Sequence, residues 1–132
     1  CLVEVIHEVV NRKIPFLGIC LGLQLLFERS DESDGIDGLG ILPGEILRIP
    51  AGNGVKIPHI GWNSLSFSNH GRLFRGISEG AYVYFVHSYY LKAKDENIVT
   101  ASCEYGTVIH FELGNCISFF LDKMYVSLFL LG

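Results

Sequence analysis

The sequence has little positive charge and lacks the spacings that build metal sites. Its 132 residues carry 10 lysines and arginines against 14 acids, a net charge of -4, which argues against the broad basic face that nucleic-acid binding usually needs. The four cysteines form no CxxC pair and lie at no close spacing from a histidine, unlike the ligands of structural zinc sites. We therefore expect no nucleic acid, no metal and no cofactor, and a small molecule or a protein as partner.

Uninterrupted apolar runs of membrane-spanning length are also lacking. The segment 115–132 is hydrophobic, but Asp122 and Lys123 divide it into pieces too short to cross a bilayer. The cysteine pattern is typical of reduced thiols in a cytosolic protein rather than of a disulfide framework. We expect a protein that does not enter the membrane.

What is present is the composition of one globular domain, with 49% hydrophobic and 18% charged residues. The chain begins with Cys1 and not with Met, and apolar residues recur at three- and four-residue spacing over 2–10, which predicts a helix. We expect 1–132 to be a single partial domain that starts after the first strands of its fold.

The rest of the chain reads as a strand, a helix and then many short strands. "FLGI" at 16–19 predicts a short buried strand and 21–29 a helix, followed by the acidic, glycine-rich loop 30–40. Further strands are expected within 44–50, 56–67, 81–91, 97–105 and 107–113. This order predicts an α/β fold with a mixed sheet flanked by helices.

The stretch "PFLGICLGLQLLF" places Cys20 between Gly18 and Gly22. A G-x-nucleophile-x-G sequence between a strand and a helix is typical of a nucleophile elbow. The glycines are expected where the two backbones pass too closely for a Cβ, and the cysteine at the strained tip of the turn. A helix N-terminus and a nearby imidazolium would lower the thiol pKa and raise the thiolate fraction. The alternative is a small buried cysteine that only packs.

Gln24 favours the catalytic interpretation of this turn. It follows Cys20 by four residues, which places both side chains on one helix face. An amide there can reach a substrate held at the thiol.

Four motifs then point to one family. They are "PFLGICLGLQLLFE", "GIDGLGILPGEILRIP", "KIPHIGWNSL" and "YVYFVHSYYL". With them the chain resembles the class I glutamine amidotransferases and, within these, the glutaminase subunits of imidazole glycerol phosphate synthases of histidine biosynthesis, from about Phe16 to Tyr105. The resemblance implies a class I amidotransferase fold with its elbow at Cys20.

The activity implied by the resemblance is hydrolysis of glutamine to glutamate and ammonia. Cys20 would attack the side-chain amide to form a thioester, which water resolves. Ammonia would pass to a cyclase subunit, a (β/α)8 barrel, in a heterodimer of the cytoplasm, or of the plastid in a plant-like source.

By matching position, the resemblance also assigns the site residues. The elbow and its oxyanion donors would be formed by Gly18, Leu21 and Gly22. The glutamine pocket would be lined by Gln24, Glu32, His87, Ser88 and Tyr89. The cyclase would be contacted near Pro58, His59, Gly61, Trp62, Asn63 and Tyr84.

Three of these residues have plain structural alternatives. Glu32 lies in an acidic run and could be one more solvated charge. His87 could be a hydrogen-bonded structural histidine of an alternating strand. Trp62 could belong to the core, although aromatic residues are enriched at interfaces.

The end of the chain departs from the family pattern. The family takes its base and carboxylate from a late His-Pro-Glu segment, and an ungapped alignment from Gly114 puts Asp122, Lys123 and Met124 there. No histidine follows His110, and the family's Pro-Gly-x-Gly oxyanion turn is missing upstream. We expect a fragment or altered form of a glutaminase subunit, and the alternative is an inactive homologue that only binds the cyclase.

Overall fold

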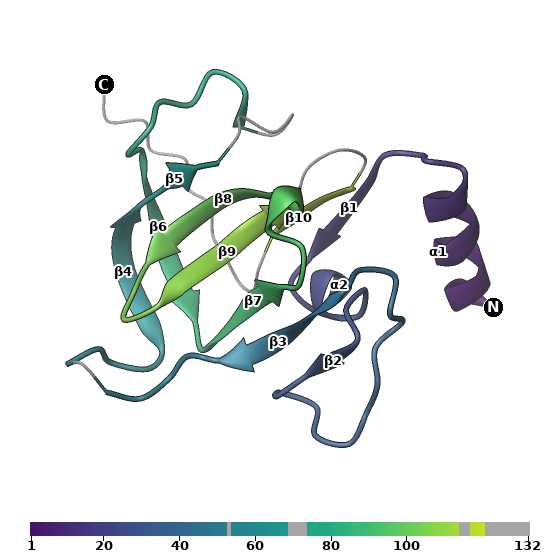
Figure 1. Cartoon of the computed structure of the whole chain (residues 1–132), viewed down its shortest axis with the longest axis horizontal. Helices are drawn as coiled ribbons and strands as arrows, with labels where there is room; N and C mark the ends of the chain where they lie inside the picture. Colours follow the sequence, from purple (N-terminus) through teal and green to yellow (C-terminus); the bar gives the residue numbers. More distant parts are fainter. Residues whose placement is uncertain (53, 69–73, 114–116, 121–132) are drawn as a thin grey trace.

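The computed structural model describes residues 1–52, 54–68, 74–113 and 117–120. Short strands dominate it, and the helices are few, with α1 at one edge of the molecule (Figure 1). The strands are β1 (Phe16–Ile19), β2 (Arg29–Ser30), β3 (Gly44–Arg48), β4 (His59–Ser64), β5 (Ser66–Phe67), β6 (Tyr82–His87), β7 (Tyr89–Ala93), β8 (Val99–Glu104), β9 (Val108–Leu113) and β10 (Ile117–Phe120).

The strands form one large sheet and two pairs. The large sheet has the order β2-β3-β7-β9-β8-β5, while β1 pairs with β10 and β4 pairs with β6. The pairs β2–β3 and β1–β10 are parallel and the others antiparallel. The mixed α/β fold expected from the sequence is confirmed, although antiparallel pairing contributes more of it than the early strand and helix suggested.

Helix α1 (Leu2–Asn11) confirms the helix predicted from the apolar spacing. None of its residues is buried, and Leu2 and Val5 are mostly exposed. Ile6 is the helical residue that packs against the core. Across the described residues, no helix combines the length and the apolar character needed to cross a membrane.

Helix α2 (Leu21–Gln24) is shorter than predicted from the sequence, which extended it to residue 29. The reason is tertiary, because the carbonyls that a longer helix would use internally accept bonds from another segment. Leu39 N–H donates to the Leu25 carbonyl at 2.7 Å, and Gly38 N–H donates to that of Glu28 at 2.9 Å. The segment 38–42 thus ends the helix and turns the chain toward β2.

Gly38 is essential to that contact. A Cβ at this position would collide with the carbonyl oxygen of Phe27. Only a residue without a side chain lets the segment 38–42 approach the end of α2 so closely. Leu26 and Phe27, which follow the helix, are consequently buried in the core.

The segment 81–91, predicted as strand, changes its partner at Ser88. Before this residue β6 pairs with β4, whereas after it β7 pairs with β3 and β9. The Ser88 carbonyl accepts the N–H of Ile49 at 2.9 Å. The turn at Ser88 therefore connects the β4–β6 pair to the large sheet.

The core lies over this sheet and the end of α2. Its fully buried members come from both, as the side chains of Phe27, Ile46, Leu91 and Ile109 show. The first strand is different, because Leu17 of β1 is about half exposed. The expectation that 16–19 forms a strand is confirmed, whereas the expectation that it is a buried strand is wrong for Leu17 in the described part of the molecule.

Candidate functional site

Cys20 lies at the tip of the turn between β1 and α2. Its backbone has φ 56° and ψ -118°, a conformation that residues with a Cβ rarely adopt and that costs on the order of 1–3 kcal/mol. The Cys20 carbonyl accepts the N–H groups of Leu23 and Gln24 at 3.0 and 3.2 Å, which starts the helix. This is the strained strand-to-helix geometry of a nucleophile elbow.

The two glycines beside Cys20 differ in their surroundings. Gly18 is buried in β1. At Gly22, an added Cβ would meet no heavy atom of the described structure within 4 Å, so the expectation that close backbone approach requires this glycine is wrong there. Leu21 is exposed at the first helical position, where a backbone N–H has no acceptor within the helix.

Gln24 and Glu32 are brought together by a short hydrogen-bond network. Gln24 is 4% exposed and donates from Nε2 to a Glu32 carboxylate oxygen at 2.8 Å. Ser30 links them, since its hydroxyl donates to Gln24 Oε1 at 3.4 Å and accepts the Glu32 N–H at 3.2 Å. Glu32 is therefore not merely a solvated acid of the loop, and Ser30 is a member of the network that no motif indicated.

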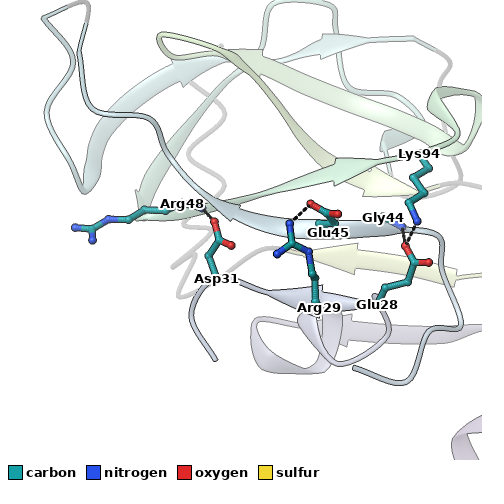
Figure 2. Close-up of polar contacts among 7 residues, drawn as sticks. All are labelled: Glu28, Arg29, Asp31, Gly44, Glu45, Arg48 and Lys94. Atoms are coloured by element: carbon teal, nitrogen blue, oxygen red, sulfur yellow. Dashed lines mark hydrogen bonds and ion pairs between the residues drawn. The ribbon is translucent and has the colours of Figure 1, made fainter. Parts of the chain in front are cut away.

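A row of polar contacts links residues 28–31 to β3 and to Lys94 (Figure 2). Arg29 pairs with Glu45 at 2.8 Å, and the Arg48 N–H donates to the Asp31 carboxylate at 3.0 Å. Glu28 pairs with Lys94 at 2.6 Å, and this hydrogen bond lowers the carboxyl pKa. These contacts fix the backbone on both sides of Ser30 and so place Glu32 beside Gln24.

A small open pocket lies beside this network. Its volume is about 50 Å³, well below the ~300 Å³ at the lower end of typical ligand pockets. The described residues therefore enclose one part of a substrate site at most. The pocket is lined by Leu21, Gln24, Leu25, Arg29, Ser30, Ser33, Ile36, Asp37 and Gly38.

Ser88 and Tyr89 lie at the same end of β3 as Asp31. Tyr89 of β7 is opposite Arg48 of β3, and the backbone of Arg48 is bonded to Asp31 on the other side. Neighbouring strands are about 4.8 Å apart, so Tyr89 and Asp31 lie roughly 10 Å apart across β3. Segments that are far apart in the sequence thus converge on one sheet end.

His87 is a buried member of β6, with 4% of its surface exposed. Its Nδ1 lies 2.9 Å from the Tyr89 carbonyl oxygen, and its Nε2 lies 2.9 Å from Nδ1 of His59. These are the contacts of a hydrogen-bonded structural histidine, the alternative that the sequence left open. A lining role toward glutamine stays a prediction.

The residues expected at the cyclase interface separate onto two faces of the β4–β6 pair. Trp62 is 50% exposed and packs edge-on against Tyr84 at 5.5 Å between ring centroids. The alternation of the strands adds Ile60 and Tyr82 to this outer apolar face, both exposed. Ile60 lies within the stretch 58–63 expected near the cyclase, whereas Tyr82, two residues from Tyr84, was not expected there.

The inner face of the same pair holds His59, Gly61 and Asn63 of the expected interface residues. His59 is 2% exposed, and Asn63 donates from Nδ2 to the Glu104 carbonyl at 2.9 Å. Pro58 is exposed, and Gly61, half-buried, has a φ of 142° that favours glycine. The prediction that Trp62 lies at the surface is confirmed. His59 is buried and has almost no surface with which to contact a partner.

The match to known proteins now decides the family. The model of the family "Glutamine amidotransferase class-I" matches residues 1–114. The chain belongs to the class I glutamine amidotransferase family. The resemblance stated from the four motifs is confirmed.

The relatives of this amidotransferase carry a more specific name. The chain is 54% identical over 105 residues to imidazole glycerol phosphate synthase subunit HisH of Moorella thermoacetica, covering 80% of the chain and 49% of the relative. It is 50% identical over 120 residues to the HisH subunit of Aquifex aeolicus, covering 89% and 57%. The chain spans about half the length of the curated relatives that it matches.

Asp122, Lys123 and Met124, where the alignment places the family's base, lie outside the described residues. Among the described residues, His110 has a buried Nδ1 without a hydrogen-bond partner, and burial lowers the pKa of its ring. Among the same residues, no three His, Cys, Asp or Glu side chains gather as metal ligands would.

Proposed function

We propose that this protein is a glutaminase subunit of imidazole glycerol phosphate synthase that hydrolyses glutamine through Cys20. The observation that carries the proposal is the strained backbone at Cys20, φ 56° and ψ -118°, within a chain of this family. A strained turn is maintained only when the surrounding structure requires it, and such turns are common at active sites. The names of the relatives support the choice of reaction.

The chemistry follows from the position of the sulfur. The Cys20 thiolate attacks the carbon of the glutamine side-chain amide, and the C–N bond breaks as the nitrogen takes up a proton and leaves as ammonia. Water then attacks the thioester, which releases glutamate and restores the thiol. The N–H groups at the start of α2, including that of Leu21, are suited to bind the oxyanion formed in each step.

Glutamine would be recognised by the network at the end of β3. The Glu32 carboxylate, held by Gln24, suits the ammonium group of an amino acid. Tyr89 lies across β3, roughly 10 Å from Asp31. Together with Ser88 it would close the opposite side of the glutamine site. His87 would contribute to glutamine binding indirectly, because its ring is hydrogen-bonded to the Tyr89 carbonyl.

The outer face of the β4–β6 pair is the proposed contact with the cyclase subunit. Ile60, Trp62 and Tyr82 are at least half exposed there, and buried aromatic residues are typical anchors of protein interfaces. Replacing Trp62 with Ala in the complete protein should weaken binding of the barrel subunit by about 1–3 kcal/mol. Unchanged affinity in titration calorimetry would remove Trp62 from the interface.

A second function, a binding module without glutaminase activity, is favoured by one observation. Asp122 stands where the family's histidine is expected, and a carboxylate with a pKa near 3.9 is a poor base at neutral pH and holds almost no proton to give. Its negative charge would also raise the thiol pKa. Asp122→His alone should restore little, because Met124 supplies no carboxylate to orient the new histidine.

One experiment separates the two functions. Ammonia release from glutamine is measured with the protein, the cyclase and the cyclase ligand present, and compared with Cys20→Ala. Turnover that Cys20→Ala abolishes supports the glutaminase and would require another base, for which His87 and His110 are the candidates. No turnover together with cyclase binding supports the binding module.

The bacterial and archaeal sources of the relatives favour the cytoplasm over a plastid as its compartment.

A further inference from the structure

His59 and His87 form a buried ring pair on the inner face of the β4–β6 pair. The two residues are opposite each other in the antiparallel register, and Nδ1 of His59 lies 2.9 Å from Nε2 of His87. Exposed fractions of 2% and 4% exclude water from most of both rings. Their contact is therefore a hydrogen bond inside the protein.

The Tyr89 carbonyl fixes the direction of this bond. A carbonyl oxygen only accepts, so Nδ1 of His87, 2.9 Å away, carries the proton. In a neutral ring Nε2 of His87 must then be the acceptor, and Nδ1 of His59 must be the donor. Burial lowers the pKa of His59 to about 4, so this ring is uncharged at neutral pH.

Two aromatic rings hold His59 in the orientation that this bond needs. Phe85 stacks on His59 at 4.7 Å and Tyr105 at 3.7 Å between centroids, each at 15°. Tyr105 is itself fixed, because its hydroxyl donates to the Lys56 carbonyl at 2.8 Å and accepts the Lys56 N–H at 3.3 Å. The imidazole of His59 thus has little freedom to rotate away from His87.

The line of hydrogen bonds ends at the turn where the chain leaves β6 for β7 and the large sheet. The Tyr89 carbonyl accepts the His87 ring proton, and the Ser88 carbonyl accepts the Ile49 N–H. The backbone of the turn is therefore held by β3 on one side and by the His87 ring on the other. The orientation of that ring depends on His59.

We propose that His59 is a positioning residue, which through His87 fixes the backbone of Ser88 and Tyr89. The consequence for glutamine rests on the proposed function, in which these two residues close the substrate site. A site displaced by about 1 Å can lose on the order of a hundredfold in rate, so an indirect contact of this kind matters. His59 itself is 2% exposed, so the effect we propose for it is indirect.

The first test needs no substitution. Nitrogen-15 spectra of the histidine rings in the free protein should show His59 and His87 both protonated at Nδ1 and unprotonated at Nε2 at neutral pH. A proton on Nε2 of either ring would overturn the proposal, because the bond would then be absent or reversed.

The second test uses a matched pair of variants. His59→Phe keeps the ring between Phe85 and Tyr105 but removes the donor, whereas His59→Asn loses the stacking and keeps an N–H near the position of Nδ1. We expect His59→Phe to shift the backbone amide signals of Ser88 and Tyr89 in the free protein and His59→Asn to leave them near their original positions. Equal shifts in both variants, or none in His59→Phe, would overturn the proposal.

Glutamine then tests the functional consequence separately. We expect His59→Phe to raise the dissociation constant or KM for glutamine roughly tenfold or more, with a smaller change in kcat, and His59→Asn to recover most of the affinity. Unchanged affinity in His59→Phe, with amide signals that move, would overturn the link to the substrate. If the unmodified protein does not bind glutamine, the proposed function fails, while the ring protonation and amide signals still decide the role of His59.

Discussion

Helix α1 and the end of α2 carry similar apolar patterns, yet they differ in burial. Leu23, Leu26 and Phe27 are at most 1% exposed, whereas Leu2 of α1 is 74% exposed. Figure 1 shows α1 at one edge of the molecule, where Ile6 is the helical residue that packs against the core, whereas Leu23, Leu26 and Phe27 belong to the buried cluster of the sheet. An amphipathic sequence therefore predicts a helix but not the surface that covers it, and the stability of the described chain comes from the sheet side.

The largest effect should come from emptying the sheet core. Leu91 is fully buried between β3 and β9, so Leu91→Ala should lower the free energy of unfolding by about 2–5 kcal/mol. Leu2→Ala is the matched control and should change it by less than about 0.5 kcal/mol. Urea unfolding measures both, and equal losses would show that α1 is as firmly packed in solution as the core.

A smaller effect is expected from Gly22 of the elbow and Gly38 of the segment 38–42. Gly38→Ala should lower the free energy of unfolding by about 1–3 kcal/mol, because the new Cβ meets the Phe27 carbonyl. Gly22→Ala should be neutral or stabilising by up to about 1 kcal/mol, since nothing described lies within 4 Å of it. Thermal melts of the two variants test this order, and a reversed order would contradict it.

The acid dependence of stability separates buried from exposed titrating groups. Desolvation and the neighbouring His87 lower the pKa of His59 from 6.5 to about 4, so the unfolded chain binds a proton that the folded chain does not. Its contribution to the free energy of unfolding is full above pH 6.5 and is lost as the pH falls from about 6.5 to about 4. Urea midpoints from pH 7.5 to 5 should therefore fall less in His59→Phe than in the unmodified protein.

The same titration at high salt provides a control for the exposed acids. Hydrogen bonds from Lys94 and Arg29 lower the pKa of Glu28 and of Glu45 below 4.5, so their contribution is lost only as the pH falls below that value. Salt of about 1 M screens exposed pairs and should leave the loss between pH 6.5 and 5 unchanged. Parallel pH profiles of the unmodified protein and His59→Phe would contradict the assignment.

The smallest effect should come from the exposed ion pairs of Figure 2. Arg29→Met removes the pair with Glu45, whose partners are both substantially exposed, and such pairs contribute little to stability. We expect no resolved change in the urea midpoint. A loss as large as that of Leu91→Ala would show that this row of contacts, rather than the core, holds β2 on the sheet.

Much of the site could be predicted because its signals are local. The glycines and the apolar residues around Cys20 specified a strand, a sharp turn and a helix start, and the backbone at Cys20 has the strained conformation that this order predicts. The four-residue offset placed Gln24 on the helix, where it is buried. Period-two alternation likewise predicted most strands, since side-chain direction along a strand depends only on neighbouring residues.

The sequence by itself determined the family, the elbow and the approximate positions of the strands and of α1. Only the tertiary structure decided where α2 ends, because residues 38–42 donate to the carbonyls of residues 25–28 that follow it. It also decided that Trp62 faces outward while His59 is buried, and that the chain changes strand partners at Ser88. The physical reason is that dihedral preferences act between neighbours in the chain, whereas hydrogen-bond partners and buried faces depend on residues that only the folded structure brings into contact.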